Sequence, residues 1–415
     1  MVYVTPQVEG YDSINSIKSF SGKVDNLVVI PSRNAVSTIA YVISMVREGL
    51  EKLGGDWMII VIDGLSSDGT LEIVRVMKKK IGEEKLFVVP NTVSKGKGGA
   101  MKLGVDIAYY LGVNSLVFVD SDLRSITPEW IELLARGAVK QGYTTPLYIR
   151  DRFDATITNF VARPLTVAAY MVNVKQPIGG DFGLGDKLIE YLATEAPWYN
   201  TPWNLLFGTD IFITHSALSR RIIPAEAYLG SKIHEAKDPG KSLKNMFIEV
   251  TGSLYTSLIE YAESWTSLTR EELVEPPIIE SPDIVFIPPP RIKVDKKHSL
   301  ETFKELKTDT TVLGFLNEET RRKVIEAINS DKGIDHHTWA QILVQAYRAF
   351  YRNQQHSKRK QILETLYHLW QGRLYEYYNT VEKAEEKQVE EELWRQVKAL
   401  IDLRPELIEA VKNFK

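Results

Sequence analysis

The first 120 residues alternate between short, continuous apolar runs and longer segments of helical periodicity. The apolar runs have the length of strands, and they are Leu27–Ile30, Trp57–Ile62, Leu86–Val89 and Leu116–Val119. The segments between them repeat apolar residues every three or four positions, and they are Ile39–Leu53, Thr70–Ile81 and Ala100–Leu111. Strand–helix–strand order predicts a parallel sheet with right-handed crossovers. We therefore expect the carboxyl ends of these strands to share one edge, where α/β sheets bind ligands.

The pattern changes along the chain and suggests three parts. At 415 residues the chain is long enough for about two or three domains. After residue 150 the alternation loosens, a helical segment follows at about 241–268, and prolines at 276–277 and 288–290 indicate an extended connector. We expect a catalytic α/β domain over residues 1–274, a proline-rich connector over 275–298 and a helical domain over 299–415.

Composition narrows the class of protein. The net charge of -3 gives no reason to expect nucleic acid or an anionic membrane as a partner. There is no apolar run of about 18 residues and no basic-then-apolar start, so we expect a cytoplasmic protein. The absence of cysteine excludes disulfides and thiolate ligands, so a metal would need carboxylate, imidazole, phosphate or water.

The fourth apolar run ends in two carboxylates one residue apart, Asp120 and Asp122. Alternate side chains of an extended chain share a side, so both would point the same way at the sheet edge. Hard oxygen ligands of this kind suit a hydrated Mg²⁺ or Mn²⁺ ion, or a ribose. The same short pattern occurs in plain strand-end turns, and both interpretations stay open on these residues alone.

Three other segments would bring polar groups to this edge. Asp63, followed by Gly64–Thr70, could accept from a nucleobase or ribose, or the segment could be a turn and helix cap. Lys97 lies in Ser94–Met101, whose glycines could admit a phosphate or form a flexible turn; the spacing is not that of a Walker loop, which argues against an ATPase. His234 could be a neutral metal ligand, although a lone histidine is more often structural.

The residues beyond the connector are helix-patterned and rich in Trp and Tyr. Apolar side chains such as Trp339 and Phe350 fall on one helical face, which favours core packing over an aromatic ligand site. His336 and His337 are adjacent, so their side chains diverge by about 100° on a helix and do not form a metal pair. The aromatic region could form a homodimer face or pack within its own chain.

The motifs occur in a recognisable order: Pro31–Asn34, Asp63–Thr70, Gly96–Gly98, and Asp120–Asp122 followed by Pro128–Trp130. In this order the chain resembles nucleotide-sugar glycosyltransferases of the GT-A fold. The later motifs are Arg150 with Phe153–Thr158, Gln176–Asp181, Gly208–Asp210, and His234 with Leu243–Met246. These resemble retaining mannosylglycerate and glucosylglycerate synthases, and the helical C-terminal region matches as well. The resemblance implies a Rossmann-like α/β domain that binds a nucleotide sugar, followed by a mainly α-helical region.

The resemblance also implies roles for matching positions. Asp122 and His234 would hold Mg²⁺ or Mn²⁺ on the diphosphate, and Asp120 would lie near the ribose. Asp181 and Asp210 would face the donor sugar and, with Lys97, form the catalytic set. The donor-binding positions implied by the match are Pro31, Arg33, Asp63, Lys97, Asp120, Gln176, Gly179 and Gly180.

Arg150 and Thr158 would hold the carboxylate of the acceptor. The alternative for Arg150 is a structural pair with Asp151 or Asp154. The chain departs from the family pattern where it has Arg33 in place of lysine, Lys237 in place of tyrosine and Asp181 in place of glutamate. An added basic residue near the acceptor would favour 3-phosphoglycerate.

The expected activity is transfer of glucose or mannose to D-glycerate, a hexosyltransferase reaction that makes a compatible solute. The donor would be GDP-mannose, GDP-glucose, UDP-glucose or ADP-glucose, and the acceptor glycerate or 3-phosphoglycerate. An inverting enzyme with Asp181 or Asp210 as base is the main alternative. Pro31–Asn34 in place of an arginine-containing glycine loop argues against a nucleotidyltransferase, and a pure carbohydrate-binding module would not need both a nucleotide pocket and a metal pair.

Overall fold

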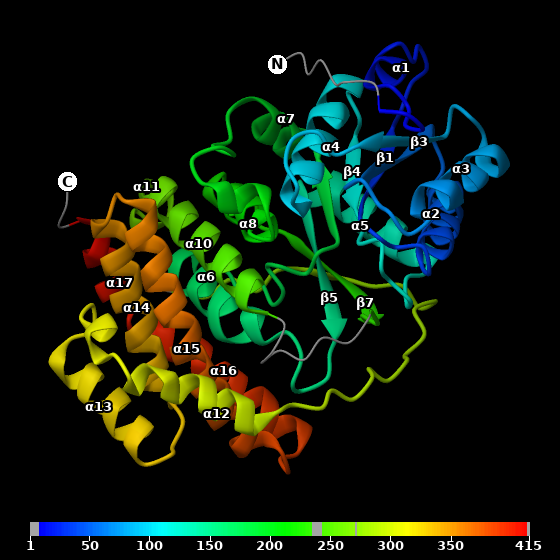
Figure 1. Ribbon diagram of the computed structural model, residues 1–415. Helices are drawn as coiled ribbons and strands as arrows, with labels where there is room; N and C mark the ends of the chain where they lie inside the picture. The colour runs from blue at the N-terminus through cyan, green and yellow to red at the C-terminus, as the bar shows by residue number, and fades with distance from the viewer. Residues whose placement is uncertain (1–7, 235–242, 270–271, 413–415) are drawn as a thin grey trace. The chain divides into compact units, whose positions relative to one another are not determined.

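The computed structural model describes residues 8–234, 243–269 and 272–412 (Figure 1). The chain forms two compact units, and each is built from segments that are separate in the sequence. The first unit draws on residues 1–149, 178–235 and 276–289. The second draws on residues 150–177, 236–275 and 290–415.

The first unit is built on an eight-stranded sheet with the order β3-β2-β1-β4-β6-β5-β7-β8. The strands are β1 (Asn26–Ser32), β2 (Trp57–Asp63), β3 (Leu86–Pro90), β4 (Ser115–Phe118), β5 (Tyr143–Ile149), β6 (Phe182–Gly185), β7 (Ala225–Ser231) and β8 (Ile278–Ile279). Strands β1 to β4 pair in parallel, whereas β6 runs antiparallel to both β4 and β5. The predicted parallel sheet is therefore extended into a mixed one.

Helices of the first unit follow the strands in the expected alternation. They are α1 (Ile14–Lys18), α2 (Ile39–Leu53), α3 (Thr70–Ile81), α4 (Lys97–Leu111), α5 (Pro128–Gln141), α7 (Asp186–Thr194), the 3-10 helix η2 (Pro202–Leu205) and α8 (Thr209–Ser219). Helices α2 and α3 have the predicted bounds, and α4 begins three residues earlier than the periodicity indicated.

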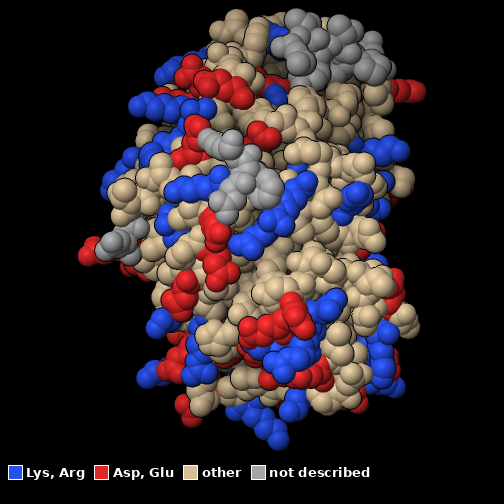
Figure 2. Space-filling model, turned by 90° about the vertical axis from the view of Figure 1, so that its left-hand side faces the viewer, with Lys and Arg blue, Asp and Glu red and all other residues tan. Residues whose placement is uncertain are grey.

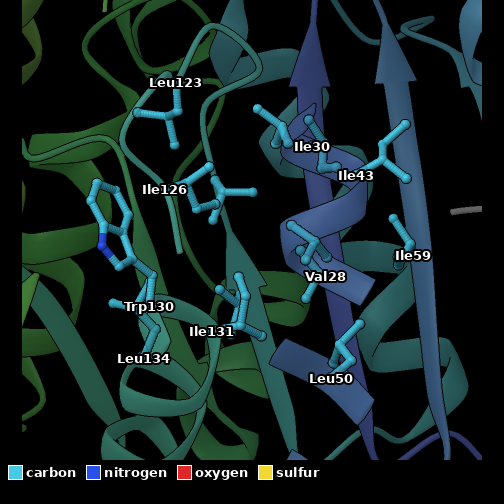
Figure 3. Packing of buried hydrophobic residues seen from close by; sticks show 14 of the residues in the cluster. Val28, Ile30, Ile43, Leu50, Ile59, Leu123, Ile126, Trp130, Ile131 and Leu134 are labelled. Atoms are coloured by element: carbon cyan, nitrogen blue, oxygen red, sulfur yellow. The ribbon is translucent and has the colours of Figure 1, made fainter. Parts of the chain in front are cut away.

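The apolar stripes of α2 and α5 pack on the sheet. Figure 3 shows Ile43 and Leu50 of α2 facing Val28 of β1 and Ile59 of β2, with Trp130 of α5 in the same buried cluster. These side chains are at most 1% exposed. Fully burying one such side chain stabilises the fold by roughly 1.5 to 3 kcal/mol, so this cluster holds the strand ends in register.

The second unit is helical in the residues described. Its helices are the π-helix η1 (Thr158–Ala162), α6 (Arg163–Tyr170), α10 (Lys244–Glu260), α11 (Ala262–Thr266), α12 (Lys296–Lys304), the 3-10 helices η3 (Glu305–Lys307) and η4 (Thr310–Leu313), α13 (Glu318–Asn329), α14 (His336–Arg352), α15 (His356–Val381), α16 (Glu386–Asp402) and α17 (Arg404–Lys412). In Figure 1 the orange and red helices α14 to α16 lie with the green α6 and α10, which they contact.

Aromatic side chains form the core of this second unit, as the sequence predicts. Trp339 of α14 is fully buried and donates from Nε1 to the carbonyl of Phe160, 2.8 Å away. Tyr255 of α10 donates to the carbonyl of Leu343 at 2.9 Å. The expected fold class, a Rossmann-like α/β region followed by a mainly α-helical one, is confirmed. The domain limits at 274 and 299 stay a proposal. Helices α6 and α10 precede residue 274 but belong to the same compact unit as the later helices.

Charged side chains are mixed on the surface. On the face drawn in Figure 2, basic and acidic residues of the described segments are interspersed. Within residues 8–234, 243–269 and 272–412, no helix combines the length and the apolar character that crossing a membrane requires.

Candidate active site

Two lysines hold Asp120 in the first unit. Asp120 follows β4, and its Oδ1 lies 2.8 Å from Nζ of Lys97, at the first turn of α4. Its Oδ2 lies 2.7 Å from Nζ of Lys232, which directly follows β7. The Lys232 side chain is 5% exposed and that of Asp120 is 23% exposed, so the pair is largely removed from water. Charges attract each other more strongly there than they do in water. Burial would raise the pKa of Asp120, but the two ammonium groups outweigh it and hold the pKa well below its usual range.

The Gly179-Gly180 pair belongs to the same cluster. The carbonyl of Gly179 accepts from Lys232 at 2.9 Å, and that of Gly180 accepts from Lys97 at 3.3 Å. Gly180 has φ +91°, and an added Cβ would lie 2.4 Å from Oδ2 of Asp120. Only glycine can bring the backbone this close to the carboxylate, which gives the predicted Gly-Gly motif a physical reason.

Asp181 is fully buried and bound on both oxygens by protein groups. Its Oδ1 accepts from the backbone N–H of Asp120 at 2.8 Å, and its Oδ2 accepts from Lys232 at 2.7 Å. The hydroxyl of Tyr148, in β5, also donates to Oδ2. The predicted role of Asp181, to face the donor sugar directly, stays a prediction; in this arrangement the carboxylate orders Asp120 and Lys232.

Asp210, in the first turn of α8, completes the cluster. Its Oδ1 is 3.4 Å from Nζ of Lys97, and its side chain is 10% exposed. Burial raises the pKa of Asp210 even though Lys97 opposes the shift. Lys97 itself has a raised pKa because Asp120 and Asp210 outweigh its burial. The ammonium of Lys97 therefore stays charged between two carboxylates.

Asp122 and His234 lie on two segments that are bonded to each other. The carbonyl of Ile233 accepts from the backbone N–H of Arg124 at 2.9 Å, and the N–H of Ile233 donates to Oγ of Ser125 at 2.9 Å. The Asp122 carboxylate has no hydrogen-bond or ion-pair partner among the described residues. One carboxylate and one imidazole fit a metal that takes its remaining ligands from phosphate and water. The described residues hold no group of three His, Asp or Glu side chains that could bind a metal alone.

Asp63 lies at the end of β2, as predicted, and its carboxylate is enclosed. Oδ1 accepts from the hydroxyl of Ser66 at 2.6 Å, and Oδ2 accepts from the N–H of Ser66 at 2.8 Å. The hydroxyl of Tyr11 donates to the same Oδ2 at 2.6 Å. The Ser66 hydroxyl also accepts from the N–H of Asn34 at 2.7 Å, so the loops after β1 and β2 are joined.

The other predicted residues of this edge are placed as follows. Pro31 lies in β1, in register with Ile62 of β2. Arg33 is exposed directly after β1 and extends over Gly64, where an added Cβ would lie 3.3 Å from its Cδ.

The glycines at the start of α4 have a packing role. A Cβ on Gly98 would lie 2.3 Å from the carbonyl oxygen of Asn204, and one on Gly96 would lie 2.5 Å from that of Leu205. The N–H of Gly98 donates to the carbonyl of Leu206 at 3.2 Å, and the N–H of Gly96 donates to Oγ of Ser94 at 3.1 Å. The close approach that we expected for a phosphate is made by protein backbone at these two positions.

Three predicted residues belong to the second unit. Arg150 pairs through Nη1 with Oδ2 of Asp154 at 3.0 Å, one of the partners considered from sequence. Thr158 is buried at the start of η1, and Gln176 is also buried. Lys237, where the family pattern has tyrosine, lies outside the described residues.

Comparison with known proteins shows what part of this chain is similar to. Residues 27–188 match the family model described as glycosyl transferase family 2. This stretch of the chain is similar to that family. The expected enzyme class, a hexosyltransferase, and the expected resemblance are thereby confirmed.

Solved structures similar to this glycosyltransferase include glucosyl-3-phosphoglycerate synthase from Mycobacterium tuberculosis. Its complex with Mn²⁺, uridine diphosphate and phosphoglyceric acid is 23% identical, with 59% of this chain and 82% of that chain covered, at TM-score 0.45. Its complex with Mg²⁺ and uridine diphosphate is 22% identical, with 59% and 83% covered, at TM-score 0.44. A mycobacterial protein is 20% identical, with 60% and 79% covered, at TM-score 0.42. Because these TM-scores are below 0.5, the similarity does not identify the substrate of this glycosyltransferase, which has to be inferred from its own residues.

Sequence reasoning missed three residues of the glycosyltransferase site. The signal that could have marked Lys232 is its place directly after a strand, at the edge where the predicted site lies. Tyr148 and Tyr11 gave no signal, because tyrosine in a strand or near a terminus is common. Tyr11 contacts Asp63, and Tyr148 contacts Asp181, each from a distant part of the sequence. The spacing of residues along the chain does not predict such contacts.

Proposed function

We propose that this glycosyltransferase moves glucose or mannose from a nucleoside-diphosphate sugar to D-glycerate, with retention of configuration and with Mg²⁺ or Mn²⁺ as cofactor. The observation that carries the proposal is Asp120 held between Lys97 and Lys232 at the sheet edge that also bears Asp122. The edge thus offers cations for a diphosphate and a carboxylate for a hydrated metal.

Charge stabilisation is the chemistry that Lys97 supplies. When the bond between sugar and diphosphate breaks, negative charge grows on the leaving oxygen. The Lys97 ammonium stays protonated because Asp120 and Asp210 raise its pKa, so it is ready to meet that charge. Its position between two carboxylates also keeps it from turning away before the donor arrives.

Asp122 and His234 are the residues that would hold the metal. The metal ion would act as a Lewis acid on the diphosphate. The backbone bonds of Ile233 to Arg124 and Ser125 keep the segment that carries His234 against the loop that carries Asp122. This pairing supports the assignment independently of the family resemblance.

The acceptor proposal rests on Arg150. Its present partner is a carboxylate, Asp154, so its surroundings already suit a carboxylate, and glycerate would replace one with another. The nearest basic neighbour in sequence, Arg152, donates to the carbonyls of Val381 at 2.9 Å and Ala384 at 2.6 Å and pairs with Glu386. Because Arg152 is committed to these groups, glycerate is favoured over 3-phosphoglycerate.

The surroundings of Asp181 and Asp210, the two residues that could act as base in an inverting reaction, favour retention of configuration. Asp181 accepts hydrogen bonds from three donors, which leaves it little capacity to take a proton from an acceptor hydroxyl. Asp210 keeps the inverting alternative open, because its raised pKa is typical of a base. In a retaining reaction the leaving phosphate oxygen takes the acceptor proton. Anomeric analysis of the product by NMR separates the two outcomes.

A matrix of donors and acceptors tests the proposal. GDP-mannose, GDP-glucose, UDP-glucose and ADP-glucose are each incubated with D-glycerate and 3-phosphoglycerate in the presence of Mg²⁺. Release of nucleoside diphosphate and the product mass are both measured, so that hydrolysis is distinguished from transfer. A glycosyl-glycerate product with one donor supports the proposal, transfer only to 3-phosphoglycerate selects the phosphorylated acceptor, and no product with either contradicts both.

A further inference from the structure

The side chain of Arg152 is bound at the carboxyl end of α15. Its Nη1 donates to the carbonyl of Val381, the last residue of that helix, at 2.9 Å and to the carbonyl of Ala384 at 2.6 Å. The last carbonyls of a helix lack intrahelical donors and form the negative end of its dipole, so a guanidinium suits this place. Nη2 pairs with Glu386 of α16, but that carboxylate is 77% exposed, where an ion pair contributes little. The two carbonyl bonds are therefore the stronger contacts of Arg152.

The backbone around Arg152 is bound to the same helix. Tyr377 of α15 is fully buried, and its hydroxyl donates to the carbonyl of Arg152 at 2.7 Å. Burial raises the pKa of Tyr377, so the phenol stays protonated and able to donate. The ring of Phe153 packs edge-on against that of Tyr378, with 5.3 Å between the ring centroids. Side-chain bonds, a backbone bond and ring packing thus hold one short segment at the end of α15.

This segment is the turn that carries Arg150. The N–H of Asp154 donates to the carbonyl of Asp151 at 2.9 Å, and Oδ1 of Asp151 accepts from the N–H of Phe153 at 2.9 Å. An aspartate that binds backbone two residues further on is a common feature of turns. The ion pair between Arg150 and Asp154, at 3.0 Å, spans the turn, and Arg152 lies in its middle. Because the turn is braced internally, the contacts that fix Arg152 on α15 also fix where Arg150 lies.

We propose that Arg152 is a positioning residue for the acceptor, an inference that rests on the proposed function. Arg150 would hold the acceptor carboxylate, and a bidentate contact tolerates little displacement of the guanidinium. Without the Arg152 side chain, the turn keeps Arg150 but loses its bonds to the end of α15. Fewer molecules then hold Arg150 in place before the acceptor arrives, which weakens acceptor binding by the same factor. The end of α15 thereby becomes a working part of the acceptor site.

Kinetics that separate the acceptor from the donor test the inference. The full chain with Mg²⁺ and an active donor is assayed for transfer over a series of acceptor concentrations, and for donor hydrolysis without acceptor. The acceptor is glycerate or 3-phosphoglycerate, whichever the wild type uses. Arg152→Met should raise the acceptor KM about tenfold to a hundredfold, while kcat and donor hydrolysis stay within about threefold of the wild type.

Three further variants identify which contact of Arg152 matters. Glu386→Ala removes only the exposed ion pair and is the matched control, with an acceptor KM within about twofold of the wild type. Tyr377→Phe keeps the ring and loses the bond to the carbonyl of Arg152, so it should raise the acceptor KM about threefold to tenfold. Arg152→Lys can still donate to the carbonyls at the end of α15 and should recover most of the loss.

The outcomes are distinct. An unchanged acceptor KM in Arg152→Met overturns the inference, as does an equal fall of hydrolysis and transfer, which indicates a role in the fold alone. A KM raised as much by Glu386→Ala as by Arg152→Met overturns the role of the carbonyl bonds. A wild type that hydrolyses the donor but transfers to neither acceptor overturns the proposed function itself. Thermal melts separate lost affinity from lost fold, and Tyr377→Phe decides the question if Arg152→Met does not fold: an unchanged KM in that variant then overturns the inference.

Discussion

Lys232 and Asp120 form a partly buried ion pair with 2.7 Å between Nζ and Oδ2, and the same ammonium lies 2.7 Å from Oδ2 of the fully buried Asp181. One cation thus serves two carboxylates from segments that follow β4 and precede β6. Removing it leaves both carboxylates in a site with little water.

Lys232→Met should lower the free energy of unfolding by about 3 to 5 kcal/mol and abolish most transfer, because the buried Asp181 loses its cation and Asp120 keeps only Lys97. Urea denaturation measures the first effect. Adding Asp181→Asn to Lys232→Met should restore part of the stability, since one uncompensated charge is then removed. Lys187→Met, on the exposed face of α7, is the control and should cost little. A loss equal to that of the control would contradict the central role of Lys232.

Asp122→Ala or His234→Ala should reduce metal-dependent transfer about a thousandfold or more, because each removes a proposed metal ligand. The melting temperature should stay near that of the wild type, since the Asp122 carboxylate makes no bond within the described protein. Steady-state rates over a series of Mn²⁺ concentrations provide the measurement, with Asp186→Ala on α7 as a control. Near wild-type turnover in Asp122→Ala would refute the metal assignment.

Gly180→Ala should inactivate the enzyme, because its Cβ would lie 2.4 Å from Oδ2 of Asp120 and 2.9 Å from Nζ of Lys232. Gly112→Ala is a matched control: its φ is also positive, at +64°, but its Cβ would meet nothing within 4 Å. Both variants bear the backbone strain of about 1 kcal/mol or more, and only Gly180→Ala disturbs the cluster. Equal kcat values in the two variants would show that the contact does not matter.

Arg150→Ala should lower the efficiency of transfer to glycerate by about 30-fold to 1,000-fold, equivalent to roughly 2 to 4 kcal/mol of a charge-assisted contact. Donor hydrolysis without acceptor should survive. Arg136→Ala, which breaks the exposed i,i+4 pair with Glu132, controls for the loss of a surface ion pair. Equal loss of hydrolysis and transfer, or an unchanged KM for glycerate, would favour the structural pair with Asp154.

Asp210 should make stability depend on pH. Its folded-state pKa is raised, chiefly by burial, so the proton is bound more tightly in the folded chain than in the unfolded one. Its contribution to stability is complete below the unfolded pKa and is lost as the pH rises through the folded pKa. The stability of the wild type relative to Asp210→Asn should therefore fall as the pH rises from about 3 to 8. Urea titrations at a series of pH values measure the difference, and a flat or rising difference would contradict this sign.

Much of the fold was readable from periodicity. The helices at 39–53 and 70–81 have the predicted bounds, and the first four strands lie within three residues of the apolar runs. Local patterns suffice there because each element buries one continuous face. The short strands β6 and β8 were not foreseen, because two to four residues carry too little periodicity, and pairing with β5 and β7 is what makes them strands.

The sequence by itself determined the chemistry available to this protein: carboxylates after the second and fourth strands, a lysine at the start of a helix, a Gly-Gly pair and a histidine without competing cysteines. Only the tertiary structure decided which of them act together. Lys232 is 112 residues from Asp120 in the chain, and Tyr11 is 52 residues from Asp63. The physical reason is that sheet pairing sets the partner of a buried charge, and that pairing depends on the whole core rather than on neighbours in sequence.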